Sequence, residues 1–363
     1  MAGRKKKSAG RMPLWLYLLI VVVIALVTYF RTSGEAEAGD PQPPAASAAA
    51  QQTPADETLT VRFLDVGQGD SILLACGDET MLIDGGPVEE GQFLVSRLNR
   101  LDVTELTYVI NTHPDEDHCG GLAAVLAKYP AEHVYSSVTE YTTKVFSNVV
   151  KYADEQGHPV EVPQTGDSWT LGSASVQVIG PVQTYPDPNN GSLVLRVDYG
   201  GTSFLFTGDM EQNAEADLMD SGANVRADVL KVGHHGSPTS SSEAFLEAVA
   251  PSIAVISVGE DNDYGHPSAD VLARLEALGT TIYRTDTQGE IIITSDGQTL
   301  TVTTDPTSRE PAAGKDAPFI GNRNSMIVHS ANCAKLPGED NRVYFNTAEE
   351  AEEYGYQKHT CIK

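Results

Sequence analysis

The chain has 363 residues, 40% of them hydrophobic, which is enough for one large domain with smaller pieces around it. Its 50 acidic and 24 basic residues give a formal net charge of −26. This excess disfavours a broad electrostatic grip on nucleic acid or on an anionic bilayer, although bound metal cations can reverse the field locally. Four cysteines are too few for a disulfide scaffold.

The N-terminal part reads as a membrane anchor. A basic segment, residues 1–11, precedes an uncharged apolar run over residues 12–30, which lies at the lower limit for one transmembrane helix. The basic cluster predicts a cytoplasmic N-terminus in the cell membrane, with the rest of the chain outside. A cleavable signal peptide is the alternative, with Ala36-Glu37-Ala38 as a weak cleavage site. Residues 31–57 are rich in Ala, Pro and Gln and predict a flexible linker.

The main domain begins near Thr58 with an alternating strand pattern at residues 59–63. A glycine-rich turn at residues 65–70 follows, but it lacks the lysine of a phosphate-binding P-loop. Further strands are predicted at residues 71–75 and 81–83, and the second of these ends in Asp84-Gly85-Gly86.

The strand predicted at residues 106–110 runs into a loop in which histidines and aspartates alternate: His113, Asp115, Asp117 and His118. Imidazole nitrogens and carboxylate oxygens on one tight loop can converge on one or two cations. The alternative is a polar turn whose aspartates cap the helix predicted at residues 122–128. A capping turn has no use for histidines at both ends, so the spacing predicts a metal site.

Helical patterns alternate with short strands between residues 91 and 179. One helix is expected to present a face formed by Phe93, Leu94, Arg97, Leu98 and Leu101, and another a face formed by Val145, Val149, Val150 and Tyr152. His133 and His158 are isolated histidines near strands, and we expect both to be structural.

The second half of the domain repeats the order of strands and then mixed helices, which predicts an α/β fold. A hairpin over residues 193–206 ends in Thr207-Gly208-Asp209, where Asp209 can either bridge two cations or cap the helix expected at 211–219. The adjacent His234 and His235 follow the next strand on a glycine-flanked loop and are poor core material. His266 precedes a last helix, and strands at residues 289–294 and 299–303 close the domain.

The loop H-x-D-x-D-H, closed by two glycines, resembles the signature loop of the metallo-β-lactamase superfamily, whose usual form is H-x-H-x-D-H. The closest likeness is to the hydrolase domain of ComEC-type DNA-uptake proteins, which share the D-V-G-Q-G-D start, the T-G-D strand end and the H-H-G-S loop. The resemblance covers residues 58–305. It implies a four-layer αββα sandwich that binds two divalent metal ions.

The resemblance also implies a role for each site residue. It places one metal ion on His113 and Asp115 and the other on Asp117, His118 and His266, with Asp209 between them and Asp84 bracing the loop through hydrogen bonds. The superfamily usually supplies another histidine before the bridging aspartate, but residues 187–192 hold none. The first metal position is therefore short of a ligand and rich in oxygen, so Mn²⁺ fits it as well as Zn²⁺.

Catalysis is expected to involve Asp117, His234 and His235. Either histidine can protonate the leaving group or hold a phosphate oxygen, and His235 is the preferred candidate. Two cations can offset charge on the attacking and leaving oxygens, which suits hydrolysis of a phosphodiester.

A second linker, residues 306–316, leads to a small α+β module over residues 317–363. Four nitrogen and sulfur donors lie in it: His329, Cys333, His359 and Cys361. The module resembles the small metal-binding domain of Ada-type DNA-repair proteins, although those usually finish Cys-x-x-Cys. A structural zinc site and a Cys333–Cys361 disulfide explain the cysteines equally well. A capping box at Thr347–Glu350 predicts a short helix, and Cys76 and Cys119 are expected to be buried or inert.

The sequence as a whole predicts a membrane-tethered, extracytoplasmic, metal-dependent hydrolase, most simply a nuclease or other phosphodiesterase that acts on DNA and is related to DNA uptake. Hydrolysis of a lactone, thioester or β-lactam is the alternative within the same class, since one fold hosts many reactions. A non-catalytic envelope protein that binds DNA or a partner is the alternative from another class. The acidic site residues argue against it, because a binding relic has no need of Asp209.

Overall fold

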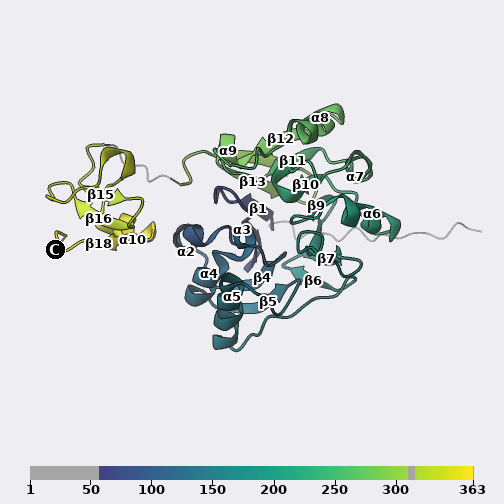
Figure 1. Ribbon diagram of the computed structural model, residues 1–363, viewed down its shortest axis with the longest axis horizontal. Coiled ribbons are helices and arrows are strands. Elements are labelled where there is room, and N and C mark those ends of the chain that lie inside the picture. The colour runs from purple at the N-terminus through teal and green to yellow at the C-terminus, as the bar shows by residue number, and fades with distance from the viewer. Residues whose placement is uncertain (1–56, 310–314, 363) are drawn as a thin grey trace, which may run out of the picture. The chain divides into compact units, whose positions relative to one another are not determined.

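The computed structural model describes residues 57–309 and 315–362 (Figure 1). The larger part contains two seven-stranded sheets. The first sheet has the strand order β14 (Leu300–Asp305), β13 (Glu290–Ser295), β1 (Leu59–Phe63), β2 (Ile72–Cys76), β3 (Glu79–Ile83), β4 (Leu106–Asn111) and β5 (Ala131–Ser136). The second has the order β12 (Thr281–Arg284), β11 (Ile253–Ile256), β10 (Val229–Lys231), β9 (Thr202–Phe206), β8 (Val194–Tyr199), β7 (Ala174–Gly180) and β6 (Ser168–Leu171).

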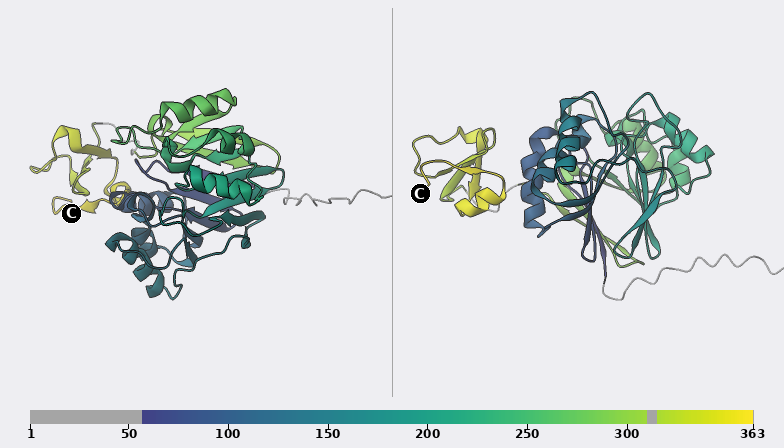
Figure 2. Two further views of the ribbon diagram at one scale, coloured as in Figure 1. Left: turned by 45° about the vertical axis from the view of Figure 1, so that its right-hand side comes forward. Right: turned by 90° about the horizontal axis from the view of Figure 1, so that it is seen from below.

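Helices cover the outer face of each sheet (Figure 2). The first sheet carries α2 (Gly91–Arg100), α4 (Leu122–Lys128) and α5 (Lys144–Glu155), and the second carries α6 (Gln212–Asp220), α7 (Glu243–Val249) and α8 (Ala269–Ala277). Short helical turns occupy the connections: η1 (Val88–Glu90), α3 (Glu116–Cys119), η2 (Gly233–Gly236) and α9 (Thr285–Gln288).

Three apolar clusters hold these layers together. The central cluster lies between the two sheets and includes Phe63 and Phe206, whose ring centroids are 6.2 Å apart. The other two clusters lie between each sheet and its helices. Burial of this apolar surface is the main favourable term for folding, and it fixes two sheets face to face between two helical layers. The prediction of an α/β sandwich is confirmed.

The structure differs from the prediction in detail. Helix α5 buries Phe146, Val149 and Ala153, whereas Val145 and Val150 are only partly buried, so the predicted face is wrong by about one position. Strand β12 and the turn α9 were not predicted, because residues 281–288 are mostly polar and half-exposed and show no strand alternation.

The strand directions determine where the site lies. Strands β3, β4 and β5 are parallel neighbours, as are β9, β10, β11 and β12. Ligands of open α/β sheets bind beyond the carboxyl ends of such strands. The residues singled out in the sequence follow those ends directly: Asp84 after β3, His113 after β4, Asp209 after β9, and His234 and His235 after β10.

The C-terminal module has its own sheet and core. Its four strands have the order β17 (Arg342–Phe345), β15 (Phe319–Asn322), β16 (Ile327–Ser330) and β18 (Gln357–Lys358), with η3 (Glu339–Asn341) and α10 (Ala348–Glu353) completing it. Val328, Phe345 and Tyr356 form part of its small core. The Thr347 side chain accepts a hydrogen bond from the backbone N–H of Glu350 at 2.9 Å, which caps α10 as the sequence predicted.

In residues 57–309 and 315–362, no helix combines the length and the apolar character needed to span a bilayer. The span predicted at residues 12–30 lies outside the described residues and stays a prediction.

Candidate metal centre

Asp84 organises the centre from its position just after β3. It is fully buried and adopts a left-handed backbone conformation with φ 58°. One carboxylate oxygen accepts hydrogen bonds from the Thr112 backbone N–H at 2.7 Å and from the Asn111 amide at 3.2 Å. The other accepts from the Thr112 hydroxyl at 2.6 Å and lies 2.9 Å from Nδ1 of His118. The carboxylate therefore fixes the ring of His118 and leaves its Nε2 directed away.

Asp84 also supports His113, through the hydroxyl group of Thr112. Its Nδ1 lies 3.1 Å from the Thr112 hydroxyl oxygen, which itself donates to Asp84, and 3.4 Å from the Ser192 hydroxyl. Ser192 also accepts a hydrogen bond from the Asp209 backbone N–H at 3.1 Å. Ser192 thus contacts the metal loop from the segment in which the sequence showed no counterpart of the superfamily's usual further histidine.

His235 follows strand β10 of the second sheet, and two neighbouring residues hold its ring. Its Nδ1 lies 2.9 Å from the Ser257 carbonyl oxygen, which can only accept, so Nδ1 carries a proton. Asp70 lies 3.3 Å from the same nitrogen and forms a fully buried ion pair with Lys231 at 2.6 Å. His234 and His235 both have positive φ, 49° and 53°, and such strain in non-glycine residues gathers at functional sites.

Four side chains converge on one point: Asp117, His118, Asp209 and His235, whose ligand atoms lie within 4.8 Å of one another. His118 Nε2 is 3.2 Å from Asp209 Oδ1, and His235 Nε2 is 3.3 Å from Asp117 Oδ2. His235 Nε2 is also 3.5 Å from Asp209 Oδ2.

The convergent atoms fit a cation. Within the described residues, Nε2 of His113, His118 and His235 and Oδ1 of Asp209 are buried without a hydrogen-bond partner. Buried polar atoms are normally paired. Imidazole nitrogens and carboxylate oxygens that face one another in this way suit a divalent metal ion such as Zn²⁺ or Mn²⁺.

The charges of the cluster perturb its histidines in opposite directions. Burial opposes protonation of His235, but the Asp209, Asp117 and Asp70 carboxylates outweigh it and raise its pKa to about 10. Burial, aided by the neighbouring His118, lowers the pKa of His113 to about 4. Without a cation, protons on His118 and His235 must balance the carboxylates, and a bound metal ion would take over that role.

The remaining predicted residues lie around this cluster. Asp115 Oδ2 is 3.7 Å from His113 Nε2, and His234 Nε2 is 3.7 Å from Asp209 Oδ2. His266 lies beyond His234, with the two ring centroids 5.6 Å apart. Asp115 occupies the N-terminal cap position of α3 without a capping bond from its side chain, and Glu211 rather than Asp209 occupies that position of α6. Helix capping therefore does not explain either aspartate.

The isolated histidines and the buried cysteines are not among the converging ligand atoms. His133 stacks on Tyr108, with ring centroids 5.1 Å apart, and His158 is exposed. Cys76 and Cys119 are buried, free thiols.

Asp70, Lys231, Ser192 and Ser257 support the centre but were not recognised in the sequence. Asp70 could have been recognised in the sequence, because it ends the glycine-rich turn. In the structure its backbone N–H donates to the Asp117 carbonyl at 3.1 Å. The turn can approach this closely because Gly69 has no side chain; a Cβ atom there would collide with that same carbonyl oxygen. Ser192 and Ser257 carry no comparable signal, because only the fold brings them to the histidines.

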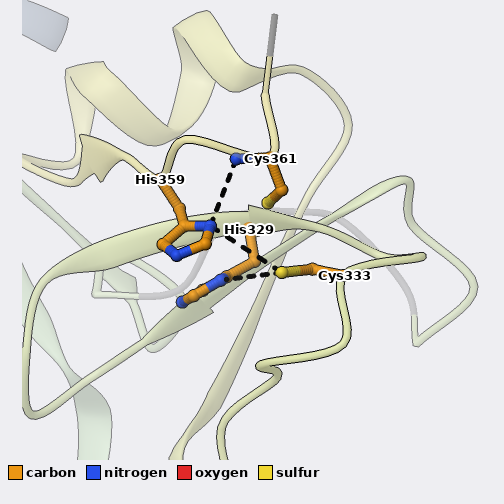
Figure 3. A group of neighbouring side chains, drawn as sticks. All are labelled: His329, Cys333, His359 and Cys361. Carbon is orange, nitrogen blue, oxygen red and sulfur yellow. Dashed lines mark hydrogen bonds between the residues drawn. The ribbon is translucent and has the colours of Figure 1, made fainter.

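The C-terminal module contains a second donor cluster (Figure 3). Ligand atoms of His329, Cys333, His359 and Cys361 lie within 4.8 Å of one another. Cys333 Sγ is 3.4 Å from Nδ1 of His329 and 3.7 Å from Nδ1 of His359. The sulfur of Cys361 accepts a hydrogen bond from the Ser330 backbone N–H at 3.4 Å, and both cysteines are free thiols.

The larger part of the chain is similar to known proteins. The family described as "Metallo-beta-lactamase superfamily" matches residues 64–260, more than half of the chain. ComE operon protein 3 of Bacillus subtilis is 33% identical over 252 residues, 64% of this chain and 32% of that protein. Competence protein ComA of Neisseria gonorrhoeae is 35% identical over 239 residues, 65% of this chain and 32% of that protein. Recombination protein 2 of Haemophilus influenzae is 32% identical over 242 residues, 64% of this chain and 28% of that protein. The chain therefore spans about a third of the length of these relatives.

Proposed function

The chain belongs to the metallo-beta-lactamase superfamily of metal-dependent hydrolases, and we propose that the bond it cleaves is a phosphodiester of DNA. The observation that carries this proposal is the convergence of Asp117, His118, Asp209 and His235 around unpaired, buried ligand atoms. The similarity to proteins named for competence and recombination supports DNA as the substrate.

Asp117, His118, Asp209 and His235 would hold one metal ion, and His113 and Asp115 would hold a second that shares Asp209. When bound, such ions offset negative charge on the phosphoryl oxygens and lower the pKa of water. His235 is assigned here as a ligand because its Nε2 faces two carboxylates while its Nδ1 donates to Ser257. The sequence-based role of His235 as proton donor requires the same Nε2 atom, so the two roles are exclusive.

His234 is left as the group that exchanges a proton with the leaving oxygen. Its side chain is 23% exposed, so it is open to substrate, and its Nδ1 lies 3.4 Å from Glu211. A carboxylate beside Nδ1 orients the ring and keeps a proton on that nitrogen, as in other carboxylate–histidine pairs. Nε2 is then the atom that gives or accepts the proton.

Lactones, thioesters and β-lactams remain the competing substrates. The proposal is tested by assaying the purified chain with Mn²⁺, Mg²⁺ and Zn²⁺ in turn on bis(p-nitrophenyl) phosphate, single- and double-stranded DNA, nitrocefin, an acyl-homoserine lactone and a thioester. We expect hydrolysis of the phosphodiesters and negligible turnover of the others. Turnover of a carboxyl derivative with intact DNA would refute the assignment, and DNA binding without hydrolysis of any substrate would support the non-catalytic alternative.

For the C-terminal module we propose a structural zinc ion rather than a disulfide. Two nitrogen and two sulfur donors within 4.8 Å fit the tetrahedral preference of Zn²⁺, and a disulfide would leave both histidines unexplained. Native mass spectrometry of the full chain should show one bound zinc fewer in Cys333→Ser than in the wild type, and no such loss in Cys76→Ser. A mass loss of two hydrogens without zinc would instead establish the disulfide.

The tether to the cell membrane and the location outside the cytoplasm rest on residues 1–30 of the sequence alone. They are part of this proposal and have their own test below.

A further inference from the structure

A cleft of about 520 Å³ opens beside the metal loop. Its wall includes Pro114, Gly191 and Leu193, the immediate neighbours of His113, Asp115 and Ser192. The Leu193 backbone N–H donates to the Thr112 carbonyl at 2.9 Å, which fixes this wall to the metal loop. A group bound in the cleft would therefore be attached close to the atoms that hold the metal.

The chemistry of the cleft differs from that of the metal cluster. None of the described residues that line it is Lys, Arg, Asp or Glu. The lining offers two tyrosine rings, Tyr141 and Tyr185, and two exposed side-chain amides, Gln164 and Gln183. The cleft therefore has no cationic side chain to bind a phosphate. A flat, neutral group could instead stack on the tyrosine rings and form hydrogen bonds with the amides.

The cleft is built from restrained parts. The Tyr185 hydroxyl and the Gln183 amide both donate to the same Asp217 oxygen, at 2.8 and 2.6 Å. The Thr165 hydroxyl donates to the Pro181 carbonyl at 2.7 Å and ties the two loops together. Tyr141 is 37% exposed, and its ring packs against Phe146 in an edge-on arrangement, so ring surface stays accessible.

Taking the proposed phosphodiesterase activity as given, we infer that this cleft binds an unpaired nucleobase next to the scissile phosphate, which makes single-stranded DNA the preferred substrate. Its volume lies within the range of about 300–1,000 Å³ typical of small-ligand sites. A base inside a duplex is stacked and paired, and it reaches such a cleft only after it is flipped out. The net charge of −26 disfavours an extended electrostatic contact with the phosphates of DNA. Base stacking in the cleft would therefore contribute much of the binding affinity.

Binding of three fluorescent probes to the full-length chain in detergent, with Ca²⁺ in place of a catalytic metal, tests the inference. The probes are a thymidine decamer, an abasic decamer with the same phosphates, and a blunt duplex of the same length. We expect the thymidine decamer to bind about 5- to 160-fold more tightly than the other two, the range that stacking of one base supplies.

Variants of one cleft residue sharpen the test. Tyr141→Ala should abolish the preference for the thymidine decamer, and Tyr141→Phe should preserve it because stacking needs only the ring. Tyr152→Ala, which removes a tyrosine on α5 outside this cleft, is the matched control and should preserve the preference. Thermal melts of the three variants confirm that each is folded.

Equal binding of the thymidine and abasic decamers, or an unchanged preference in Tyr141→Ala, would overturn the inference and leave the cleft to another occupant, such as an acyl chain. Failure of the proposed function has a different signature. In that case bis(p-nitrophenyl) phosphate and both single strands would stay intact with Mn²⁺ and Zn²⁺, whatever the binding preference.

Discussion

Replacement of Asp84 by asparagine tests the support of the metal centre with little change of shape. Asparagine tolerates the left-handed backbone of this position better than most residues, so the loop should keep its course. The amide cannot reproduce the carboxylate, however. Each oxygen of Asp84 faces two groups: the Thr112 N–H and the Asn111 amide on one side, and the Thr112 hydroxyl and His118 Nδ1 on the other.

The NH₂ group of the asparagine cannot take the place of the oxygen that faces the Thr112 N–H and the Asn111 amide, because both of these partners are hydrogen-bond donors. The NH₂ group must therefore face His118, which then accepts at Nδ1 and carries its proton on Nε2. A protonated Nε2 cannot bind a metal ion. Loss of such supporting partners typically costs 10- to 100-fold in metal affinity, or about 1.4–2.7 kcal/mol.

Chelator competition with Mn²⁺ and Zn²⁺ gives the affinity of the wild type and of Asp84→Asn. Asp228→Asn is the matched control, because the Asp228 carboxylate accepts hydrogen bonds from the Ser203 N–H at 2.8 Å and hydroxyl at 2.7 Å away from the metal cluster. We expect the control to lose some stability and keep its metal affinity. Wild-type affinity in Asp84→Asn would refute the role given to this carboxylate.

Three further predictions follow from the same structure. His235→Ala should lose both its metal and its activity. His234→Ala should keep a near-normal metal content while its activity falls by about 10²–10⁴-fold. The reverse pattern in metal analysis would restore His235 as the proton donor. Lys231→Met should destabilise the domain by about 3–5 kcal/mol, because it removes the lysine that pairs with the buried Asp70 carboxylate. The double variant with Asp70→Asn should recover part of the loss in thermal melts, and an unchanged melting temperature in the single variant would contradict this. Protease added to intact spheroplasts should digest the hydrolase domain, and full protection would exclude the predicted topology.

Sequence reasoning located the metal loop because its signal is local. His113, Asp115, Asp117 and His118 lie within six positions, and strand patterns before the loop and helix patterns after it place it at a strand end. Asp209 and His235 were singled out in the same way, from short motifs that each follow a strand, although His235 was predicted as a proton donor and not as a ligand. Several strands were predictable because apolar and polar residues alternate along them, as in β1 with its buried Leu59, Val61 and Phe63, whereas their arrangement in two sheets followed from the family resemblance.

The parts that sequence reasoning missed depend on contacts between distant segments. Lys231 looks like an ordinary strand residue, and only the approach of Asp70 from the other sheet explains how its charge can be fully buried. Ser257 matters through a backbone carbonyl, which any residue type would supply. The sequence also does not show which imidazole faces Asp209, because His235 and His266 both follow strand ends; in the structure His235 Nε2 lies 3.5 Å from Asp209, and the metal role of His266 stays a prediction.

Metal-dependent recovery of activity tests the central claim most directly. The purified chain is stripped with a chelator, then titrated with Mn²⁺ or Zn²⁺ while bound metal and the rate of phosphodiester hydrolysis are measured on the same samples. We predict no hydrolysis in the stripped protein, recovery in proportion to metal bound, and no recovery in Asp209→Ala, whose hydrolase domain should stay empty. Hydrolysis at the full rate by stripped protein, or by Asp209→Ala without metal in the hydrolase domain, would contradict the account.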